Sequence, residues 1–219
     1  GSLCGLVLFV AWFSFVCWFS LCVFVLLVSW FSLWQSLKAQ GLPDYLVLAL
    51  QRLYESQIGM VRGPRGETSS DFAIQRGVRQ GCPMSPILFV SVMQVVMEKW
   101  LAKVGESGWE MSTEGPRLTN LRFADDLLLF ARTEAEAGYM LEYLIDELAL
   151  VGLRLNPKKT VLLTNVSDHM PHHRLHSGEA VQIIGQDGAH KWLGRMLSTN
   201  EGRMFGDDTA ARLKAGAAA

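Results

Sequence analysis

The stretch that decides the fold is "LRFADDLLLF", residues 121–130, in which two adjacent aspartates interrupt an apolar run. The apolar residues on either side are typical of two short buried strands, and the segment Ala124-Asp125-Asp126 between them is typical of a tight turn. A turn of this kind projects its side chains from the end of a hairpin, where a ligand can reach them. The sequence therefore predicts a hairpin with two carboxylates at its tip.

Two neighbouring carboxylates repel each other, and a divalent cation relieves that repulsion. Mg²⁺ is a hard ion that takes carboxylate oxygens and is often shared with substrate phosphates. In two-metal sites such ions stabilise the attacking and leaving oxygens of a phosphoryl transfer. Because aspartate is also a common turn residue, a solvated turn without a metal is the alternative for Asp125 and Asp126 taken alone.

A second stretch, "QRGVRQGCPMSPILF" (75–89), precedes the hairpin. Gly77 and Gly81 permit close approach of the backbone, and two prolines stiffen the chain before a helix predicted over 85–104, with Ser85 as its N-cap. Helix N-termini and exposed amides attract phosphate, so this turn is a candidate phosphate contact. The alternative is an ordinary helix entry, in which Arg79 and Gln80 are surface residues.

The remaining signals predict a globular α+β chain. The expected elements are a helix over 41–57, a hairpin over 58–75, a helix over 133–152, a turn and strand over 153–165, and a strand-like segment at 190–197. Thr133 and Glu136 predict a capping box, and Gly152 is suited to end the helix.

The two motifs together resemble motifs B and C of reverse transcriptases, most closely those of non-LTR (LINE-type) retrotransposons. "GLRLNPKKT" (152–160) resembles motif D, and "KWLG" (191–194) resembles motif E. The resemblance spans residues 33–197 in the family's order and spacing. It implies an α+β fold, a partial polymerase palm whose antiparallel sheet is packed against helices, with part of the fingers.

The resemblance also implies roles for individual residues. Asp125 and Asp126 would be the catalytic carboxylates and ligands of Mg²⁺, with Mn²⁺ as a substitute. An RNA template, a DNA primer and deoxynucleoside triphosphates would be the partners. The nucleotide and template side would be lined by Arg79, Gln80, Gly81, Pro83, Ser85, Phe123, Lys158 and Lys159. The net charge of −1 is not that of a broadly basic protein, so positive charge for nucleic acid would have to be local. The positive groups along the nucleic-acid path would be Arg62, Arg65, Arg76 and Arg79.

The third carboxylate of the family site, which belongs to motif A, is missing. Counting back from Trp34 places it at residue 25 or 26, where this chain has Val25 and Leu26, and no acidic residue precedes Asp44. Two carboxylates can hold Mg²⁺ weakly but do not fix two ions for in-line attack on a phosphate. The sequence therefore predicts the remnant of an RNA-directed DNA polymerase that is inactive as this chain.

Residues 1–37 carry no charged side chain. A helix over 6–31 would be about 39 Å long, enough to cross a hydrocarbon core of roughly 30 Å. This favours a transmembrane helix and, as an alternative function, a single-pass membrane protein with an inert polymerase remnant. A misjoined sequence is the rival interpretation. A third hypothesis is that residues 20–31 replace the missing motif A strand beside the hairpin.

The expected organisation is an apolar segment over 1–32, a partial reverse transcriptase domain over 33–197 and a low-complexity tail over 198–219. Four cysteines without paired spacing predict no disulfide. Four of the five histidines gather in 169–176, but their loop-like context does not favour a metal site. The chain would be at a membrane if residues 6–31 span one, and otherwise in the cytoplasm or nucleus.

Overall fold

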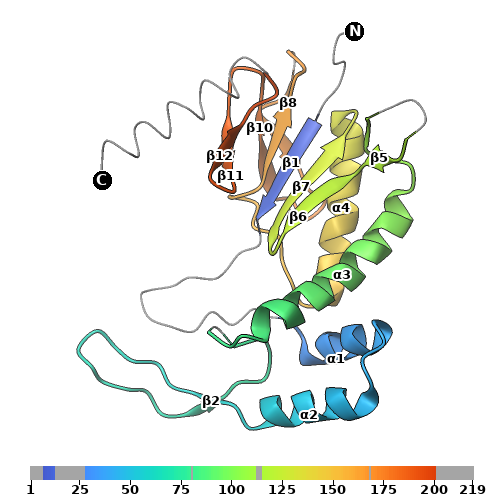
Figure 1. Ribbon diagram of the computed structural model, residues 1–219. Coiled ribbons are helices and arrows are strands. Elements are labelled where there is room, and N and C mark those ends of the chain that lie inside the picture. Colours follow the sequence, from blue (N-terminus) through green and yellow to red (C-terminus); the bar gives the residue numbers. More distant parts are fainter. Residues whose placement is uncertain (1–6, 13–27, 80, 112–114, 168, 201–219) are drawn as a thin grey trace. The chain divides into compact units, whose positions relative to one another are not determined.

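The computed structural model describes residues 7–12, 28–79, 81–111, 115–167 and 169–200 (Figure 1). The chain divides into two compact units. The sheet unit comprises Gly1–Ser14, Leu101–Ile145 and Leu155–Ala219. The helical unit comprises Phe15–Trp100 and Asp146–Arg154.

The sheet unit is built on six strands in the order β6-β7-β1-β8-β10-β9. Their bounds are β6 Asn120–Phe123, β7 Asp126–Ala131, β1 Val7–Trp12, β8 Val161–Thr164, β10 Ala180–Ile184 and β9 His172–Arg174. All neighbouring pairs are antiparallel except β8 and β10, which are parallel. The predicted hairpin around Asp125 and the predicted strand after residue 153 are confirmed. β9 and β10 were not predicted.

Strand β1 lies in the middle of this sheet, where the sequence did not place a strand. It pairs with β7 along six residues, from Val7 opposite Ala131 to Trp12 opposite Asp126, and with β8 along four. Without β1 the sheet would consist of two separate pieces, β6-β7 and β8-β10-β9. Residues 7–12 thus hold the sheet together.

The prediction of one helix over residues 6–31 is therefore wrong for Val7–Trp12. The hypothesis that residues 20–31 form the strand beside the hairpin is wrong for Trp30 and Phe31, which begin the helix Trp30–Ala39, and residues 20–27 lie outside the described residues. The strand beside β7 is Val7–Trp12 instead. A strand buried on both faces of a sheet is a continuous apolar run, which periodicity alone does not distinguish from a membrane helix. Within the part of the chain that the structure describes, no helix is both long and apolar enough to cross a membrane.

Both faces of β7 and β8 carry buried residues. On one face, residues of the hairpin formed by β11 (His190–Trp192) and β12 (Arg195–Leu197) pack against a buried cluster. The side chains that meet there include Leu128, Val161, Leu163, Trp192 and Leu197. Leu127 and Leu129 alternate with Leu128 along β7 and are also buried, so the opposite face is closed as well, with α4 (Glu134–Leu150) behind the sheet in Figure 1.

The start of α4 is held by a partly confirmed capping box. The backbone N–H of Glu136 donates to the Thr133 hydroxyl oxygen at 3.1 Å. The Glu136 carboxylate accepts from the backbone N–H groups of Arg132 at 2.7 Å and Gly108 at 3.2 Å, rather than from that of Thr133. Burial opposes ionisation, but these bonds and the Arg132 guanidinium outweigh it and lower the pKa of Glu136. Glu136 thereby joins the start of α4 to the chain just before the small β4 (Trp109–Glu110) and β5 (Arg117–Leu118) pair.

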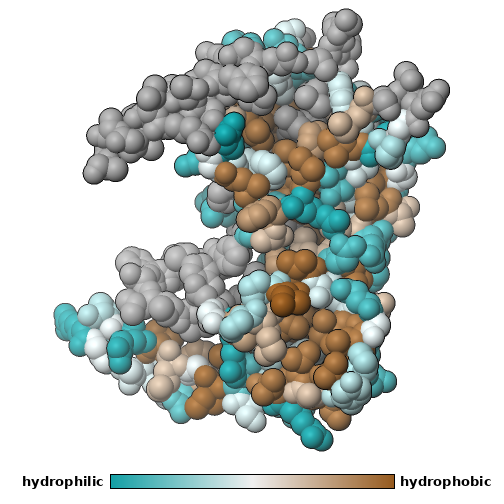
Figure 2. Space-filling view, viewed as in Figure 1, coloured by the Kyte–Doolittle hydropathy of each residue, from teal (hydrophilic) through white to brown (hydrophobic). Residues whose placement is uncertain are grey.

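The helical unit contains α1 (Trp30–Ala39), α2 (Asp44–Glu55), a hairpin of β2 (Ile58–Gly59) and β3 (Phe72–Ala73), and most of α3 (Ser85–Val104). The predicted helices and hairpin are confirmed. Buried Tyr54 meets Trp34 and Trp30 edge-on, with ring centroids 5.6 and 5.9 Å apart. Large hydrophobic and aromatic side chains also remain exposed on this unit, among them Tyr45, Leu46, Leu53 and Ile87. Figure 2 shows in brown the hydrophobic residues on the face of the molecule in view.

A glycine in α4 gives a test of how β9 is held. A Cβ built on Gly138 would lie 2.5 Å from Cε1 and 2.9 Å from Nε2 of His173 in β9. Helix propensity alone predicts that Gly138→Ala stabilises the chain by about 1 kcal/mol. We expect the opposite sign, a loss of about 1–3 kcal/mol, because the imidazole must leave its place. Urea unfolding measures the difference.

His173→Ala is the matched control for this test. In a His173→Ala background the contact is absent, so Gly138→Ala should recover the stabilisation that helix propensity predicts. A Gly138→Ala variant as stable as the parent, with no coupling between the two positions, would show that the imidazole does not press on α4.

Candidate active-site hairpin

The two aspartates lie at the tip of the β6-β7 hairpin. Phe123 pairs with Asp126, so only Ala124 and Asp125 form the loop. Ala124 has a φ of 55°, a left-handed conformation that costs a non-glycine residue of the order of 1–2 kcal/mol. Two-residue hairpin loops require a positive φ of this kind. The turn therefore holds Asp125 at the tip in a strained backbone, with the exposed Phe123 ring beside it.

The environment of the pair disfavours its negative charge. Burial raises the pKa of Asp125, although a backbone hydrogen bond and the charge of Lys159 act in the opposite direction. Burial also raises the pKa of Asp126, and the neighbouring Asp125 carboxylate adds to the effect. Two partly desolvated like charges that lie next to each other are stabilised by a cation. In this chain Lys159 supplies part of that positive charge.

Lys159 is positioned by a turn whose organising residue the sequence analysis missed. The side-chain oxygen of Asn156 accepts from the backbone N–H of Lys158 at 3.0 Å, and its carbonyl accepts from that of Lys159 at 3.1 Å. The carbonyl of Asn156 also accepts from the hydroxyl of buried Thr160 at 2.8 Å. Asparagine often orders a turn in this way, so "NPKKT" contained the signal.

Among the described residues, no third acidic residue joins the pair. The register of β1 on β7 places residue 12 opposite Asp126, and residue 12 is a tryptophan. Among the described residues, no group of three or more histidine, cysteine, aspartate or glutamate residues could hold a metal ion, and this includes the described histidines of 169–176. The donor set at the tip fits one hard cation held by two carboxylates and does not fit a bridged pair of ions.

The predicted residues of the preceding motif lie in the other unit. Gly77 and Gly81 have φ values of 88° and 82°. Nothing lies within 4 Å of a Cβ built on Gly81, so that glycine serves the backbone conformation rather than a close approach within the chain. Pro83 and Ser85 follow at the start of α3, and Gln80 lies outside the described residues.

Ser85 differs from its predicted N-cap role, and Arg79 has a contact within the chain that the sequence did not predict. Ser85 is the first residue of α3 rather than its N-cap, and its buried hydroxyl has no hydrogen-bond partner among the described residues. The Arg79 guanidinium donates to the Leu53 carbonyl at 3.5 Å and lies 5.9 Å from the centre of the Tyr54 ring. Arg79 thus connects its turn to the end of α2.

The fold of this chain is similar to that of solved telomerase structures. An apo telomerase from Candida tropicalis superposes with a TM-score of 0.55 at 13% identity, covering 83% of this chain and 33% of that one. A form of the same enzyme truncated from its C-terminal domain gives 0.53 at 15% identity, covering 78% and 33%. At these identities the likeness shows the fold, a polymerase palm.

Sequence comparison identifies the family. Residues 25–197 match the family model described as reverse transcriptase (RNA-dependent DNA polymerase). The chain therefore belongs to the reverse transcriptase family, and its domain is of the non-LTR retrotransposon type.

Two curated relatives support this placement. The Pol polyprotein of the type-2 retrotransposable element R2DM of Drosophila melanogaster is 37% identical over 129 residues, 58% of this chain and 12% of that protein. The Pol polyprotein of the type-1 element R2 of Popillia japonica is 26% identical over 167 residues, 73% and 26% respectively. This chain thus spans a small part of the length of either relative.

The raised pKa values of the two aspartates give a test of their environment. An acidic group with a higher pKa in the folded state than in the unfolded state stabilises the fold at pH values below its unfolded-state pKa. This stabilisation is lost as the pH rises through the folded-state pKa. At pH 7 we therefore expect Asp125→Asn to stabilise the metal-free chain by about 0.5–1 kcal/mol, allowing for solvent screening. The expected rise in Tm is roughly 1–4 °C.

This gain should shrink as the pH falls toward the ordinary aspartate pKa of 3.8, since both chains are then neutral at this position. Asp71→Asn, at an exposed carboxylate before β3, is the control and should leave Tm unchanged. A loss of stability in Asp125→Asn at pH 7 would contradict the inferred repulsion at the tip.

Proposed function

We propose that this chain is a non-catalytic reverse transcriptase domain, which keeps the nucleic-acid surface of the family without the metal geometry for nucleotide addition. The observation that carries the proposal is the register of β1. The position opposite Asp126 in the neighbouring strand is Trp12, and no acidic residue occurs before Asp44.

The chemistry of phosphoryl transfer explains why this loss is severe. Two ions must be held in a fixed relation to the attacking and leaving oxygens, and small displacements cost large factors in rate. Asp125 and Asp126 share one hairpin, so both donors approach a metal from the same strand connection. Lys159 acts on both charges and competes with a metal for them. The tip can hold one divalent ion weakly, and we assign no reaction step to it.

The partners that we propose follow the family: an RNA template, a DNA primer and, as a ligand only, deoxynucleoside triphosphate. Exposed Arg62 and Arg65 lie at the far end of the β2-β3 hairpin, Arg62 just before the turn from Gly63 to Gly66 and Arg65 within it. Local cations of this kind bind phosphates even on a chain with a net charge near zero. We also retain the boundaries 33–197 for the partial domain and 198–219 for the tail as part of the proposal.

Primer extension tests the absence of catalysis. With an RNA template, a DNA primer and Mg²⁺ or Mn²⁺, we expect the full chain to incorporate no more nucleotide than Asp125→Asn, because the ions are not fixed. Incorporation by the parent chain that Asp125→Asn abolishes would overturn the proposal.

A gain of function tests the assigned cause. Directly opposite residues of an antiparallel pair have Cβ atoms about 4.5–5.5 Å apart, so Trp12→Asp places a carboxylate next to Asp126. We expect its incorporation to exceed that of Trp12→Asn and of Ala11→Asp by at least ~10-fold, about 1.4 kcal/mol in the barrier. Circular dichroism confirms that the three variants fold alike. Equal incorporation in all three, above the Asp125→Asn background, would show that position 12 is not the deficient one.

Salt dependence tests the proposed nucleic-acid surface. We expect the affinity for an RNA–DNA hybrid to fall with salt, and Arg62→Ala and Arg65→Ala each to reduce the slope of log K against log salt by about 1. Arg52→Ala, at an exposed arginine in the last turn of α2, should leave the slope unchanged. Equal slopes in all four proteins would place the hybrid elsewhere.

A further inference from the structure

Helix α2 leaves most of its surface uncovered. Its buried residues are Val47 and Tyr54, which lie seven positions apart and therefore on one face of the helix. On that face Tyr54 meets the Trp30 and Trp34 rings of α1. The other sides of α2 carry large apolar side chains that stay exposed, and a contiguous exposed apolar surface is typical of an interaction site.

Four apolar residues of α2 form a stripe beside its buried face. Leu46 is 40% exposed and Leu53 is 58% exposed, while Ala49 is exposed and Leu50 is half-buried. Their spacing is i, i+3, i+4 and i+7, which places them on one side of the helix. The gaps between the four positions are three, one and three residues. The stripe is therefore the same when it is followed in either direction along the helix.

A stripe with this symmetry is complementary to a second copy of itself. In a twofold-symmetric dimer both subunits use the same patch, and each contact occurs twice. If two α2 helices lie antiparallel with the axis between residues 49 and 50, Leu46 faces Leu53 of the second copy and Ala49 faces its Leu50. The small side chain of Ala49 at the centre lets the two helices approach closely.

The polar residues at the edges of the stripe fit the same arrangement. Tyr45 is 71% exposed, and Arg52 is exposed and makes no hydrogen bond or ion pair within the described part of the chain. In the antiparallel pair, Arg52 of one copy lies about 3 Å along the helix axis from Tyr45 of the other, which suits a cation–π contact. Asp44 and Glu55 lie on the other side of the helix, where Asp44 pairs with Lys38 at 2.7 Å, so these carboxylates do not repel each other across the contact.

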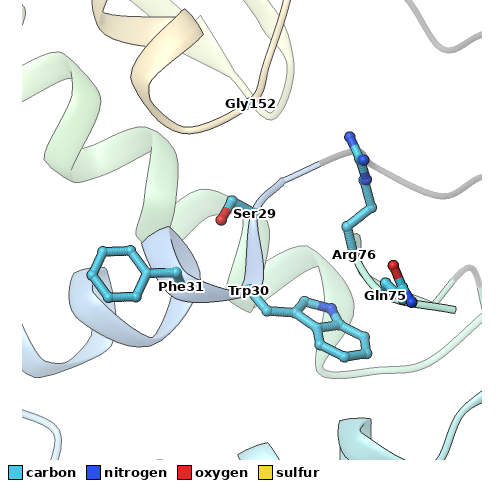
Figure 3. A pocket seen from close by; sticks show the side chains of 6 residues that line it. All are labelled: Ser29, Trp30, Phe31, Gln75, Arg76 and Gly152. Carbon is cyan, nitrogen blue, oxygen red and sulfur yellow. The ribbon is translucent and has the colours of Figure 1, made fainter.

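The stripe is separate from the cavity of the helical unit that Figure 3 shows. That cavity is lined by six residues, among them Phe31, Arg76 and Gly152, and none of the six is in α2. The stripe is thus a surface of its own rather than the rim of a pocket.

We propose that two copies of this chain associate through the α2 stripe, Leu46, Ala49, Leu50 and Leu53, as an antiparallel, twofold-symmetric pair. The inference goes beyond the proposed function, because it uses neither the carboxylate hairpin nor the nucleic-acid surface. A single helix pair is smaller than a standard interface of roughly 800 Å² per partner. The dimer is therefore weak, and its population depends on the concentration of the chain.

Sedimentation velocity of the full chain over the micromolar range measures this association. We expect the parent chain to shift from monomer to dimer as its concentration rises. Leu46→Lys and Leu53→Glu should each weaken the dimer at least about tenfold, because each places an unpaired charge in the apolar contact twice. Both positions are exposed, so the variants should fold, which circular dichroism checks.

An equimolar mixture of the two variants tests the register. In the mixed pair the introduced lysine faces the introduced glutamate, and the remaining Leu53 faces the remaining Leu46. The mixture should therefore associate about tenfold more tightly than either variant alone. Leu48→Lys is the matched control, because Leu48 is 45% exposed on the same helix and lies about 160° round it from Leu46. This variant should associate as the parent does.

The proposal is overturned if the parent chain stays monomeric at near-millimolar concentration, and the stripe would then belong to a contact with a different protein. It is also overturned if Leu48→Lys weakens the dimer as much as Leu46→Lys, or if the mixture does not recover association. Larger particles that none of the substitutions changes would show aggregation through other apolar segments and would overturn it as well. Primer extension and hybrid binding do not enter this test, so its failure leaves the proposed function intact.

Discussion

The antiparallel pairing of β1 with both β7 and β8 is the constraint on which the sheet unit depends. It joins the hairpin that carries Asp125 and Asp126 to the strands β8, β10 and β9. Six register pairs on one side and four on the other satisfy backbone groups that would otherwise form two open edges. A strand in this place needs to be apolar and extended, but it does not need to be acidic. Residues 7–12 of the apolar N-terminal run meet this structural requirement, and they place no carboxylate opposite Asp126.

The residues that pack the sheet are not the residues that would bind a metal, and this explains which features the hairpin tip keeps. The tip keeps its two-residue loop, its strained Ala124 and its two partly buried carboxylates. Their environment still disfavours negative charge, as is suited to a site that receives a cation. The lysine turn ordered by Asn156 supplies the only compensating charge that acts on both aspartates within the described residues. Under the proposed function, the palm sheet keeps its packing without a third carboxylate at the tip, since packing and metal binding use different residues.

Many of the helices and strands could be predicted from local sequence patterns. The hairpin at 120–131, the helix from Ser85 and the helix ending near Gly152 follow from apolar periodicity and turn residues, which act over a few positions. β9 and β10 were missed because "HHR" and "AVQII" are short and carry weak alternation. Ser85 was predicted as the N-cap of α3 but is its first helical residue, a difference of one position that local sequence does not resolve. The contact of the Arg79 guanidinium with the Leu53 carbonyl joins residues 26 positions apart and could not be predicted from local signals.

The sequence alone determined the family, the carboxylate hairpin and the absence of any acid before Asp44, because these are matters of residue identity and order. Only the tertiary structure decided which apolar residues complete the sheet. Periodicity cannot distinguish a strand covered on both faces from a membrane helix, and pairing between residues 7–12 and 126–131 is a contact across more than a hundred positions. The same holds for α2, which has apolar residues on more than one side, because only its packing against α1 decides which side stays exposed.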